Sequence, residues 1–423
     1  SAFYSNRVYF RRTASRKQSH NAVDLEHILR EVRSMEKIKE ILSHFPEEPF
    51  WSIDWNGLEC CELLLPWIME MRLTSQDPDW HGEGDVWMHT RMVCEELAHM
   101  EEFRKLPALQ RQELFFAALL HDIGKTRCTR QEAGRLVAPH HAAIGARIAR
   151  SLLWEKLGCS GTRSAQDFRE TVCGLIRYHT VPPYLWERED RRRLVRIAAN
   201  GELAKSFNIY LLCLLSQADL LGRIALDRRK LAEQAWFVSL LAAETGCLYG
   251  PRNFCSLYTQ RAYLAGKLNW PDTELYDHTW GEVVLLSGLP GTGKDTWIQK
   301  NCSDIPVISL DDFRIRLGIS AKGSQASVSA AAQEQAREYL RKKQSFVWNA
   351  TNLTPVLRER LVGIFEGYGA AVRIIFLETG WEEEMHRNSN RQRKVPESVI
   401  KKMLNQIVPV ERFEAQKVEW YCV

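Results

Sequence analysis

The sequence predicts two domains, an all-α domain followed by an α/β domain that contains a parallel sheet. The chain has 423 residues, more than one domain usually holds. Before residue 280 the apolar residues recur at helical spacing, and no alternating strand pattern of any length is found. After it, short β-branched runs alternate with helical patterns, as in a parallel sheet with crossover helices. We therefore expect an all-α module over 1–250 with its core at 80–230, a linker over 251–281, and an α/β module over 282–423.

The N-terminal module is expected to consist of helices. Residues 1–23 are polar and basic, and Asp24 is a suitable N-cap for a helix that runs to about Phe45. Residues 74–85 form a polar loop that contains proline and glycine. The connection over 246–281 is interrupted by glycine and proline and holds one helix near 255–267. Further helices are expected over 58–72, 86–103, 110–121, 139–158, 166–179, 194–200 and 205–244.

The C-terminal module is expected to alternate strands and helices. Its first strand, Glu282 to Ser287, is a run of valine and leucine residues that is too short for a helix. A glycine turn follows it, and residues 295–300 can begin a helix. Further strands are expected over 305–310, 345–350 and 371–377, and further helices over 327–343, 354–366 and 396–415.

Composition indicates a soluble cytoplasmic protein without a membrane span. A hydrophobic content of 45% and a charged content of 26% are those of a globular chain with a large core. The net charge of +4 is too small to indicate a nucleic-acid binder, so basic patches must be argued locally. The 11 cysteines include no C-x₂-C pair, which suits reduced thiols in the cytosol. No run approaches the ~18 apolar residues of a transmembrane helix.

Residues 282–297, EVVLLSGLPGTGKDTW, have the parts of a phosphate-binding P-loop: strand, glycine turn, lysine and helix. Glycines let backbone N–H groups turn toward phosphate oxygens, and the helix N-terminus adds its dipole. The alternative is an ordinary glycine turn between strand and helix. Asp295 stands where Ser or Thr usually follows the lysine, so the Mg²⁺ contact is left open between Asp295 and Thr296. The expected nucleotide-binding residues are Gly288, Gly291, Thr292, Gly293, Lys294, Asp295 and Thr296.

Residues 113–125, ELFFAALLHDIGK, place a polar His-Asp pair at the end of an apolar helix. Burying such a pair is costly unless a partner such as a metal ion holds it. Other histidines and one aspartate also stand beside apolar stretches, although core packing or a surface position is the better interpretation of any one of the 12 histidines taken alone. Lys125 and Arg223 could neutralise a phosphate oxygen or be solvated cations. The candidate metal ligands are His89, His121, Asp122, His141, His179 and Asp219.

Two charged groups follow strands of the C-terminal module. Asp311 and Asp312 follow a strand end, where one carboxylate can accept the proton of an attacking hydroxyl. Arg314 would face the same side and grip an acceptor phosphate. The alternative is a helix N-cap made of the two aspartates. The second group, Arg387, Arg391, Arg393 and Lys394, is interpreted as a lid over the phosphates or as a solvated face.

The order H…HD…H…H…D, with HDIGK and ADLLGR, resembles the HD-domain metal phosphohydrolases over roughly residues 80–230. The resemblance implies that His89, His121, Asp122 and Asp219 hold one metal ion. It further implies that His141 and His179 hold a second ion with Asp122 bridging, and His140 is disfavoured because His141 has the H-x-x-x-G spacing. Such ligands suit two divalent ions such as Mn²⁺, Ni²⁺, Co²⁺, Fe or Zn²⁺.

The stretches GLPGTGKDTW, LDDFR and RNSNRQRKVPESVI resemble the 5′-hydroxyl polynucleotide kinases among P-loop phosphotransferases. The resemblance implies ATP or another NTP with Mg²⁺, Lys294 and Asp311 as catalytic residues with Asp311 as general base, and Arg314 on the substrate phosphate. Arg387 and Arg391 are then catalytic lid residues. Asn349 stands where an acidic residue is expected, which leaves the Mg²⁺ ligands open.

Together the two parts resemble the bacterial bifunctional HD-domain polynucleotide kinase–phosphatases. The resemblance implies transfer of the NTP γ-phosphate to 5′-OH ends of RNA or DNA. It also implies hydrolysis of 2′,3′-cyclic phosphate, 3′-phosphate or 2′-phosphate ends in the HD site, assisted by Lys125, and a functional link to a nucleic-acid ligase. The alternatives are a small-molecule nucleotide or metabolite kinase fused to a nucleotidase or phosphodiesterase, and a non-catalytic nucleotide sensor. RNA or DNA preference, and whether the chain forms a homodimer, are left open.

Overall fold

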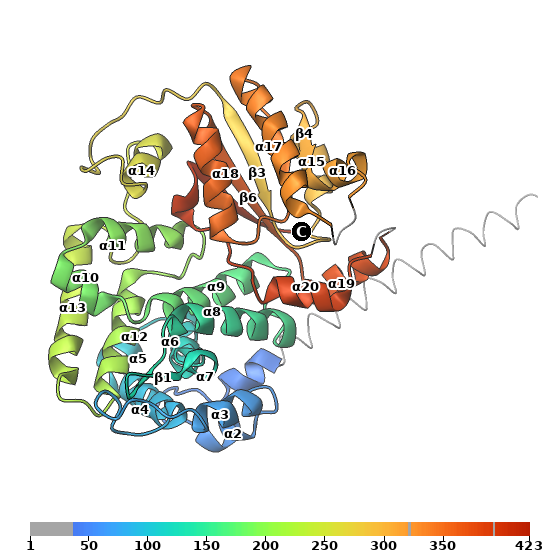
Figure 1. Cartoon of the computed structure of the whole chain (residues 1–423). Coiled ribbons are helices and arrows are strands. Elements are labelled where there is room, and N and C mark those ends of the chain that lie inside the picture. The colour runs from blue at the N-terminus through green and yellow to red at the C-terminus, as the bar shows by residue number, and fades with distance from the viewer. Residues whose placement is uncertain (1–36, 320–322, 392–393) are drawn as a thin grey trace, which may run out of the picture.

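The computed structural model describes residues 37–319, 323–391 and 394–423, in which a helical body adjoins a sheet covered by helices (Figure 1). The predicted fold class is confirmed. The predicted helix from Asp24 lies largely outside the described residues, although residues 37–42 are helical. The helices of the body are α2 (Trp55–Cys60), α3 (Leu65–Arg72), α4 (Val86–His99), α5 (Glu101–Arg104), α6 (Ala108–Leu120), α7 (Lys125–Cys128), α8 (His141–Ser151), α9 (Arg163–Tyr178), α10 (Pro182–Arg188), α11 (Arg191–Ala198), α12 (Ile209–Leu221) and α13 (Arg228–Glu244). A π-helical turn, Leu152–Lys156, extends α8, and α14 (Leu257–Leu264) lies in the connection.

The second part contains a five-stranded parallel sheet in the order β4-β5-β3-β6-β7. The strands are β3 (Glu282–Ser287), β4 (Val307–Ser309), β5 (Val347–Asn349), β6 (Ala371–Glu378) and β7 (Lys417–Cys422). The helices are α15 (Lys294–Asn301), α16 (Leu310–Arg316), α17 (Gln325–Arg341), α18 (Pro355–Gly367), α19 (Trp381–Ser389) and α20 (Glu397–Leu404). Because β3 is the central strand, the loop that follows it lies between the carboxyl ends of β5 and β6.

Several predicted helices are interrupted. The helix over 58–72 is two helices, because Pro66 lies in the first turn of α3 and has no N–H to continue an earlier helix. Gly222 ends α12 within the predicted 205–244 helix, and a Cβ there would lie 2.7 Å from the Val93 backbone. The helix over 86–103 is broken at the extended residue Met100, and that over 396–415 ends at Leu404.

Other elements had no sequence signal. A short exposed hairpin, β1 (Arg130–Glu132) and β2 (Arg135–Val137), interrupts the helical body, and each of its strands has 3 residues. The edge strand β7 and the helices α10 and α19 were not predicted as such. None of these elements alters the fold class. The hairpin is mostly exposed and stands apart from the helical core.

The two parts are joined by buried charges, which we call the interdomain seam. Arg169 of α9 is fully buried, and its Nη2 donates to Glu378 Oε2 at the end of β6, 2.6 Å away. Its Nε donates to Glu170 (2.7 Å), and its guanidinium stacks 3.9 Å from the Trp154 ring centroid. A buried charge is tolerated only when it is paired and hydrogen-bonded, so this contact requires both parts of the chain.

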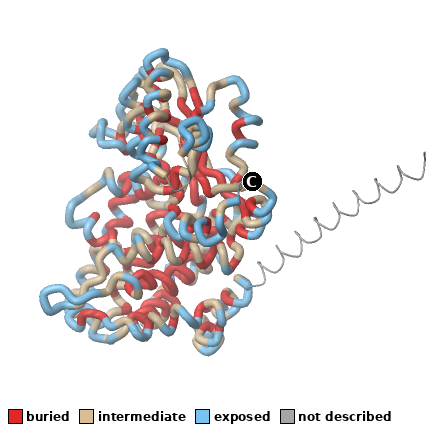
Figure 2. The backbone as a smooth tube through the Cα atoms, turned by 45° about the vertical axis from the view of Figure 1, so that its right-hand side comes forward, coloured by how far each residue is buried: buried red, intermediate tan, exposed pale blue. Residues whose placement is uncertain are grey.

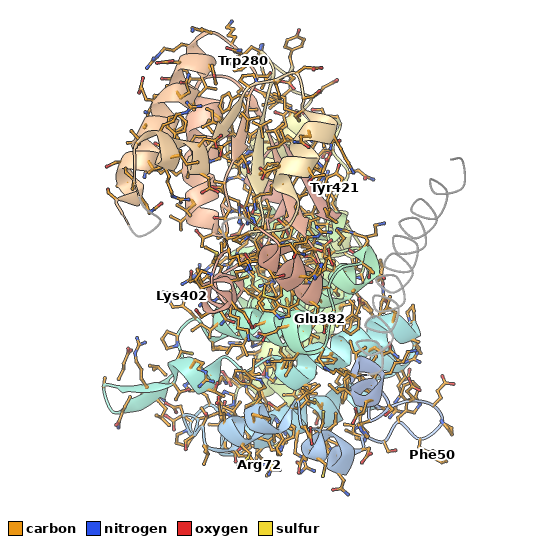
Figure 3. The ribbon with its side chains drawn as sticks, turned by 90° about the vertical axis from the view of Figure 1, so that its right-hand side faces the viewer. Phe50, Arg72, Trp280, Glu382, Lys402 and Tyr421 are labelled. Carbon is orange, nitrogen blue, oxygen red and sulfur yellow. The ribbon has the colours of Figure 1, made fainter. Side chains whose placement is uncertain are left out.

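Figures 2 and 3 show the two parts of the molecule that this seam joins. Figure 2 shows buried backbone running through both parts of the molecule. In Figure 3, Trp280 and Tyr421 lie in the sheet part and Arg72 and Phe50 at the far end of the helical body, with Glu382 between them where α19 meets that body. A further polar contact, Arg412 Nε to Glu202 Oε2 at 2.5 Å, ties the end of the chain to the same body.

Candidate functional site

The helical body brings the candidate metal ligands together from separate elements. His89 lies on α4, and Asp219 lies on α12. His121 and His179 are the residues that end α6 and α9. His141 is the first residue of α8, directly after the hairpin and the exposed His140. Helix ends therefore provide three of the side chains.

One group of ligand atoms surrounds the Nε2 atoms of His89 and His121, which lie 3.4 Å apart. Asp219 Oδ1 lies 3.0 Å from His89 Nε2 and 3.8 Å from His121 Nε2. Asp122 Oδ2 lies 3.3 Å from His121 Nε2 and 3.6 Å from His89 Nε2. These four side chains therefore direct imidazole nitrogens and carboxylate oxygens to one point.

A second group forms on the other oxygen of Asp122. Asp122 Oδ1 lies 3.4 Å from His141 Nε2 and 3.8 Å from His179 Nε2. This oxygen is buried and has no hydrogen-bond donor among the described residues. A buried carboxylate oxygen without a donor is costly, and it matches the geometry of a carboxylate that bridges two cations.

The backbone fixes how three of the histidines present their rings. The Nδ1 atoms of His121, His141 and His179 lie 2.8, 2.9 and 2.7 Å from carbonyl oxygens three residues earlier in the chain. A carbonyl only accepts, so each Nδ1 carries the proton and each Nε2 offers a lone pair to the centre. This tautomer is the one that ligates a metal ion, so the donor set fits divalent ions.

Burial and charge favour the metal-binding protonation states of His141, His179 and Asp122, whereas His89 has a raised pKa. Burial and the nearby His121 lower the pKa of His179 to about 3, and burial lowers the pKa of His141. Burial raises the pKa of Asp122, but Lys125 and His121 outweigh it and hold that pKa well below its usual range. Burial also opposes a charge on His89, yet Asp219 and Glu83 raise its pKa to about 9. Neutral His179 and His141 and an anionic Asp122 are ready to ligate.

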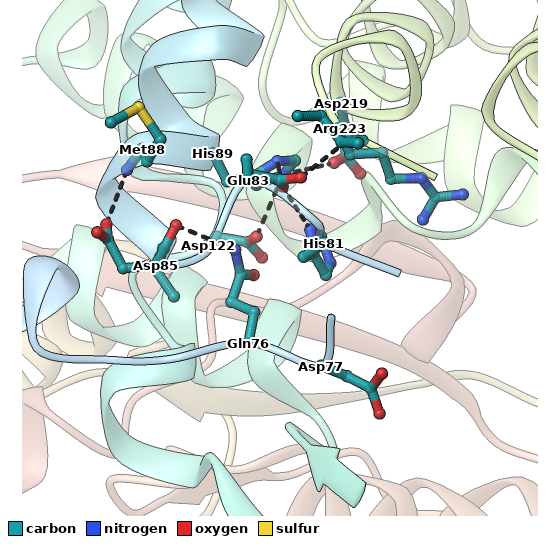
Figure 4. Close-up of polar contacts among 12 residues, drawn as sticks. Gln76, Asp77, His81, Glu83, Asp85, Met88, His89, Asp122, Asp219 and Arg223 are labelled. Atoms are coloured by element: carbon teal, nitrogen blue, oxygen red, sulfur yellow. Dashed lines mark hydrogen bonds and ion pairs between the residues drawn. The ribbon is translucent and has the colours of Figure 1, made fainter. Parts of the chain in front are cut away.

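The loop over 74–85, predicted only as polar, supplies residues that sequence reasoning missed. Glu83 Oε1 accepts from His81 Nδ1 and His89 Nδ1, both at 2.8 Å, and Glu83 Oε2 accepts from the backbone N–H of Ile224 (Figure 4). Gln76 accepts from Lys125 Nζ at 2.7 Å. The spacing of His81 and Glu83 just before His89 was the available signal, but the glycines around them favoured an ordinary loop.

The two candidate cations of this site differ in their partners. Lys125 is buried, and its Nζ lies 2.7 Å from Asp122 Oδ2, so it is not a solvated surface cation. Arg223 follows α12, with a side chain that is 12% exposed. Its Nε and Nη2 have no hydrogen-bond acceptor among the described residues, and its nearest carboxylate is Asp227 at 3.6 Å. This largely buried guanidinium group beside Asp219 therefore has nitrogens that can donate hydrogen bonds to an anion.

The glycine loop after β3 has the backbone that the sequence predicts. Gly288, Gly291 and Gly293 have φ angles of 151°, 95° and 82°, which side chains rarely adopt. A Cβ on Gly288 would also lie 2.4 Å from the Leu377 carbonyl oxygen. Lys294 begins α15, and its Nζ donates to the carbonyls of Leu289 (2.7 Å) and Gly288 (3.1 Å). Burial lowers the pKa of Lys294 to about 8.

Three further nucleotide-binding candidates surround this lysine. Thr292 is buried and donates from its hydroxyl to the Leu289 carbonyl at 2.9 Å. Asp295 and Thr296 lie exposed in the first turn of α15. Asp295 Oδ1 accepts from Asn349 Nδ2 at 2.7 Å, so the two residues that depart from the expected pattern contact each other.

The acceptor-side residues lie at the carboxyl end of β4. Ser309, not an aspartate, caps α16 by accepting from the N–H of Asp312, so the alternative interpretation as a two-aspartate cap is wrong. Asp311 is exposed in the first turn of α16 and is ion-paired with Arg314 Nη1. The predicted placement of these two residues on one side of the helix is therefore confirmed.

The proposed lid is only partly a helical face. Arg387 lies on α19, pairs with Glu383 at 2.6 Å, and has its Nη1 3.7 Å from where a Cβ on Gly293 would stand. Because α19 ends at Ser389, Arg391 lies beyond the helix and does not share a helical face with Arg387. Arg393 lies outside the described residues. Glu384, missed from the sequence, is buried under α19 with no hydrogen-bond donor among the described residues, and burial raises its pKa to about 8.

In comparisons with known proteins, a different family model matches each of the two parts of the chain. The family model described as an HD domain matches residues 85–200, and the one described as an AAA domain matches residues 283–410. A multifunctional CCA protein of Teredinibacter turnerae is 28% identical over 209 residues, 49% of this chain and 47% of that protein. One from Hahella chejuensis is 26% identical over 117 residues, 28% of this chain and 24% of that protein. The chain thus spans less than half the length of these curated relatives.

These findings combine an HD domain of the phosphohydrolase type with a P-loop kinase-like domain. The HD domain implies divalent metal binding, for which the cluster of buried histidines and aspartates is the candidate site. The P-loop implies a nucleotide with Mg²⁺. Among the described residues, no helix is both long enough and apolar enough to cross a membrane.

Proposed function

We propose that the chain is a nucleic-acid end-healing enzyme. Its P-loop module transfers the γ-phosphate of an NTP to the 5′-OH end of RNA or DNA. Its HD module hydrolyses 2′,3′-cyclic phosphate, 3′-phosphate or 2′-phosphate ends. The observation that supports the proposal most is that one chain contains both candidate sites. One is a cluster of candidate metal ligands in two groups that share Asp122, and the other is a P-loop with Asp311 and Arg314 nearby. Both sites handle phosphate at a strand end, and their products are ends that a ligase can join.

In the kinase module the protein positions the reactants and balances charge. Lys294 and the loop N–H groups hold the β and γ phosphates, and Arg387 beside Gly293 stabilises the transferred phosphoryl group. Asp311, exposed at the end of β4, accepts the proton of the attacking 5′-hydroxyl. Arg314, paired with Asp311, turns to the phosphate that follows the acceptor nucleoside.

In the HD module, His89, His121, Asp122 and Asp219 would hold one divalent ion, and His141, His179 and Asp122 a second. Two such ions, when bound, supply an activated water and neutralise the phosphoryl oxygens. The backbone carbonyls fix the histidine rings, and Glu83 orients His89. Lys125 holds Asp122, and Arg223 offers the substrate phosphate its Nε and Nη2, which have no hydrogen-bond acceptor among the described residues.

The test uses one oligonucleotide with a 5′-OH and a 3′-phosphate, incubated with Mn²⁺ and ATP, with both ends then analysed. The proposal expects a gain of the 5′-phosphate and a loss of the 3′-phosphate. Asp311→Ala should remove only the first activity, and Asp312→Ala, an exposed neighbour, serves as its matched control. No change at either end, with ATP hydrolysed or small nucleotides consumed instead, would reject the proposal.

A second candidate is a small-molecule nucleotide or metabolite kinase fused to a nucleotidase or phosphodiesterase. One observation favours it: arginines that an extended basic groove would need are already paired with other side chains. Arg191 contacts Glu244 at 3.1 Å, Arg192 donates to Asn269 at 2.9 Å, and Arg387 pairs with Glu383. The two candidates differ in acceptor, since this enzyme would phosphorylate a free nucleoside at least as well as an oligonucleotide.

The word "multifunctional" in the name of the relatives is consistent with more than one activity in a chain that contains such a region. For this chain we propose RNA or DNA ends and NTP as partners, and a ligase as the enzyme that uses its products. The sensor alternative is disfavoured, because an exposed Asp311 with Arg314 beside it is not needed merely to retain a nucleotide.

A further inference from the structure

Two departures from the usual P-loop pattern meet in the structure. The residue after the loop lysine is Asp295 rather than Ser or Thr, and the residue that ends β5 is Asn349 rather than an acid. They stand 54 positions apart in the sequence, yet Asn349 Nδ2 donates to Asp295 Oδ1 at 2.7 Å. Of the two polar atoms of an asparagine side chain, only the amide nitrogen can donate to a carboxylate, so the contact defines the orientation of the Asn349 side chain.

The fold explains why these side chains meet. Strand β5 lies directly beside β3, so its last residue faces the first turn of the helix that follows the glycine loop. Asp295 is the residue of that turn whose side chain faces β5. Thr296 lies one residue further, where an α-helix has turned by about 100°, so it faces another direction.

We propose that the acidic and neutral positions of the nucleotide Mg²⁺ site have exchanged places in this chain: Asp295 is the carboxylate that binds Mg²⁺, and Asn349 holds it in position. The inference rests on the kinase activity proposed above and names its metal-binding residue. It concerns the nucleotide Mg²⁺ and not the metal cluster of the helical body.

The chemistry of the donor set fits this assignment. Mg²⁺ in nucleotide sites is bound by one or two carboxylates together with phosphates and water. Asn349 occupies only Oδ1 of Asp295, and the described residues offer no hydrogen bond to Oδ2, which leaves that oxygen for a cation. Asp295 is exposed at the phosphate end of α15, so a hydrated ion can reach it.

The other two carboxylates near Lys294, those of Glu384 and Asp311, are less suited to bind Mg²⁺. Glu384 lies on α19 against Gly291, with its side chain fully covered. Burial raises its pKa to about 8, so at neutral pH it is largely uncharged and is a poor ligand for a hard cation. Asp311 is engaged with Arg314 on the acceptor side. Asp295 is therefore the carboxylate beside Lys294 that is exposed and not engaged by a cationic side chain.

The experiment measures binding rather than turnover. A ribose-labelled fluorescent ATP analogue is titrated into the full chain with and without Mg²⁺, and the ratio of the two Kd values gives the Mg²⁺ enhancement. Asp295→Ser should still bind the analogue without Mg²⁺, since removing a carboxylate beside the phosphates removes a repulsion, and this binding shows that the loop is folded. The variant should reduce the enhancement at least about tenfold.

The reciprocal variant makes the test specific. Asp295→Ser combined with Asn349→Asp rebuilds the usual arrangement, so the exchange predicts that the Mg²⁺ enhancement returns. Asp304→Ser removes an exposed aspartate elsewhere in the same module and is the matched control. If Asp295→Ser keeps the full enhancement, or if Thr296→Val loses it instead, Asp295 is not the ligand.

The remaining outcomes are also decisive. Loss of the enhancement in Asp295→Ser without recovery in the double variant would overturn the exchange with Asn349. A wild-type protein that shows no Mg²⁺ enhancement would overturn the proposed kinase function together with this inference. A wild-type protein that phosphorylates no oligonucleotide, but shows the enhancement and its loss and recovery, would leave the metal assignment standing and move the small-molecule kinase forward.

Discussion

Replacing Asp122 by alanine should empty both metal positions at once. The reason is geometric: Oδ2 of Asp122 lies 3.3 Å from His121 Nε2 in one ligand group, and Oδ1 lies 3.4 Å from His141 Nε2 in the other. Asp219 and His179, by contrast, each belong chiefly to one group. Asp219→Ala and His179→Ala should therefore each empty one position and leave the other.

The size of the effect follows from the ligand count. A four-ligand protein site binds its metal with about 10–16 kcal/mol, so one ligand contributes about 2.5–4 kcal/mol. At about 1.4 kcal/mol per factor of ten, its loss weakens binding about 10²–10³-fold. With free Mn²⁺ held at about ten times the wild-type Kd, occupancy should fall from about 90% to below about 10% at each position that loses its ligand.

The assay is elemental analysis of metal bound per chain after equilibrium dialysis at fixed free Mn²⁺. His140→Ala, which removes an exposed neighbouring histidine, should bind as the wild type does. Because Asp122→Ala leaves buried Lys125 with Gln76 but without a carboxylate, Asp122→Ala/Lys125→Met should be tested beside it to separate unfolding from ligand loss. Unchanged metal content in Asp122→Ala, or loss of both ions in Asp219→Ala, would refute the reasoning.

Four further predictions concern the remaining residues. Lys294→Ala should abolish 5′ phosphorylation and leave 3′-phosphate removal intact in an end-analysis assay; loss of both would indicate a shared site or a folding defect. Arg314→Ala should raise KM for oligonucleotide acceptors but not for nucleosides, and equal losses would exclude the acceptor-phosphate role. The lowered pKa of Lys294, about 8, means that above this pH the unfolded chain keeps a proton that the folded protein has lost. Thermal stability of the nucleotide-free protein should therefore gain from this group as pH rises from about 8 toward the ordinary lysine pKa of about 10.4, and Lys294→Met should lack this gain. Arg223→Ala should raise KM for phosphate-ended substrates with little change in bound metal, and an unchanged KM would return Arg223 to a structural role.

The sequence predicted most of the fold because its signals are local. The P-loop could be recognised because strand, glycines and Lys294 are contiguous, and the structure gives those glycines the backbone angles that they alone tolerate. The metal cluster could be recognised because each ligand stands beside an apolar stretch that has to enter the core. The interrupted helices were harder, because the break at Gly222 is set by the close approach of Val93 from another helix.

The residues that were missed depend on contacts that no local pattern encodes. Glu83 and Gln76 stand in a glycine-containing loop, and only the fold places them beside His89 and Lys125. Glu384 gave no signal because its burial results from packing of α19 on the glycine loop. Asp295 and Asn349 each depart from the usual P-loop pattern, but their contact could not be inferred from the sequence. It depends on the strand order of the sheet, which places β5 beside β3.

The interdomain seam has a consequence for how such a chain can change through evolution. Arg169 and Glu378 stand 209 positions apart, in halves that carry different candidate activities, yet each is the other's buried counter-charge. A substitution of either one strands a charge in the interior, so a change in one half is tolerated only with a matching change in the other. Exchanging one half for that of a homologue that lacks its member of the pair would break this contact even if both active sites were intact. The two halves are therefore expected to be inherited, and to diverge, as a single unit.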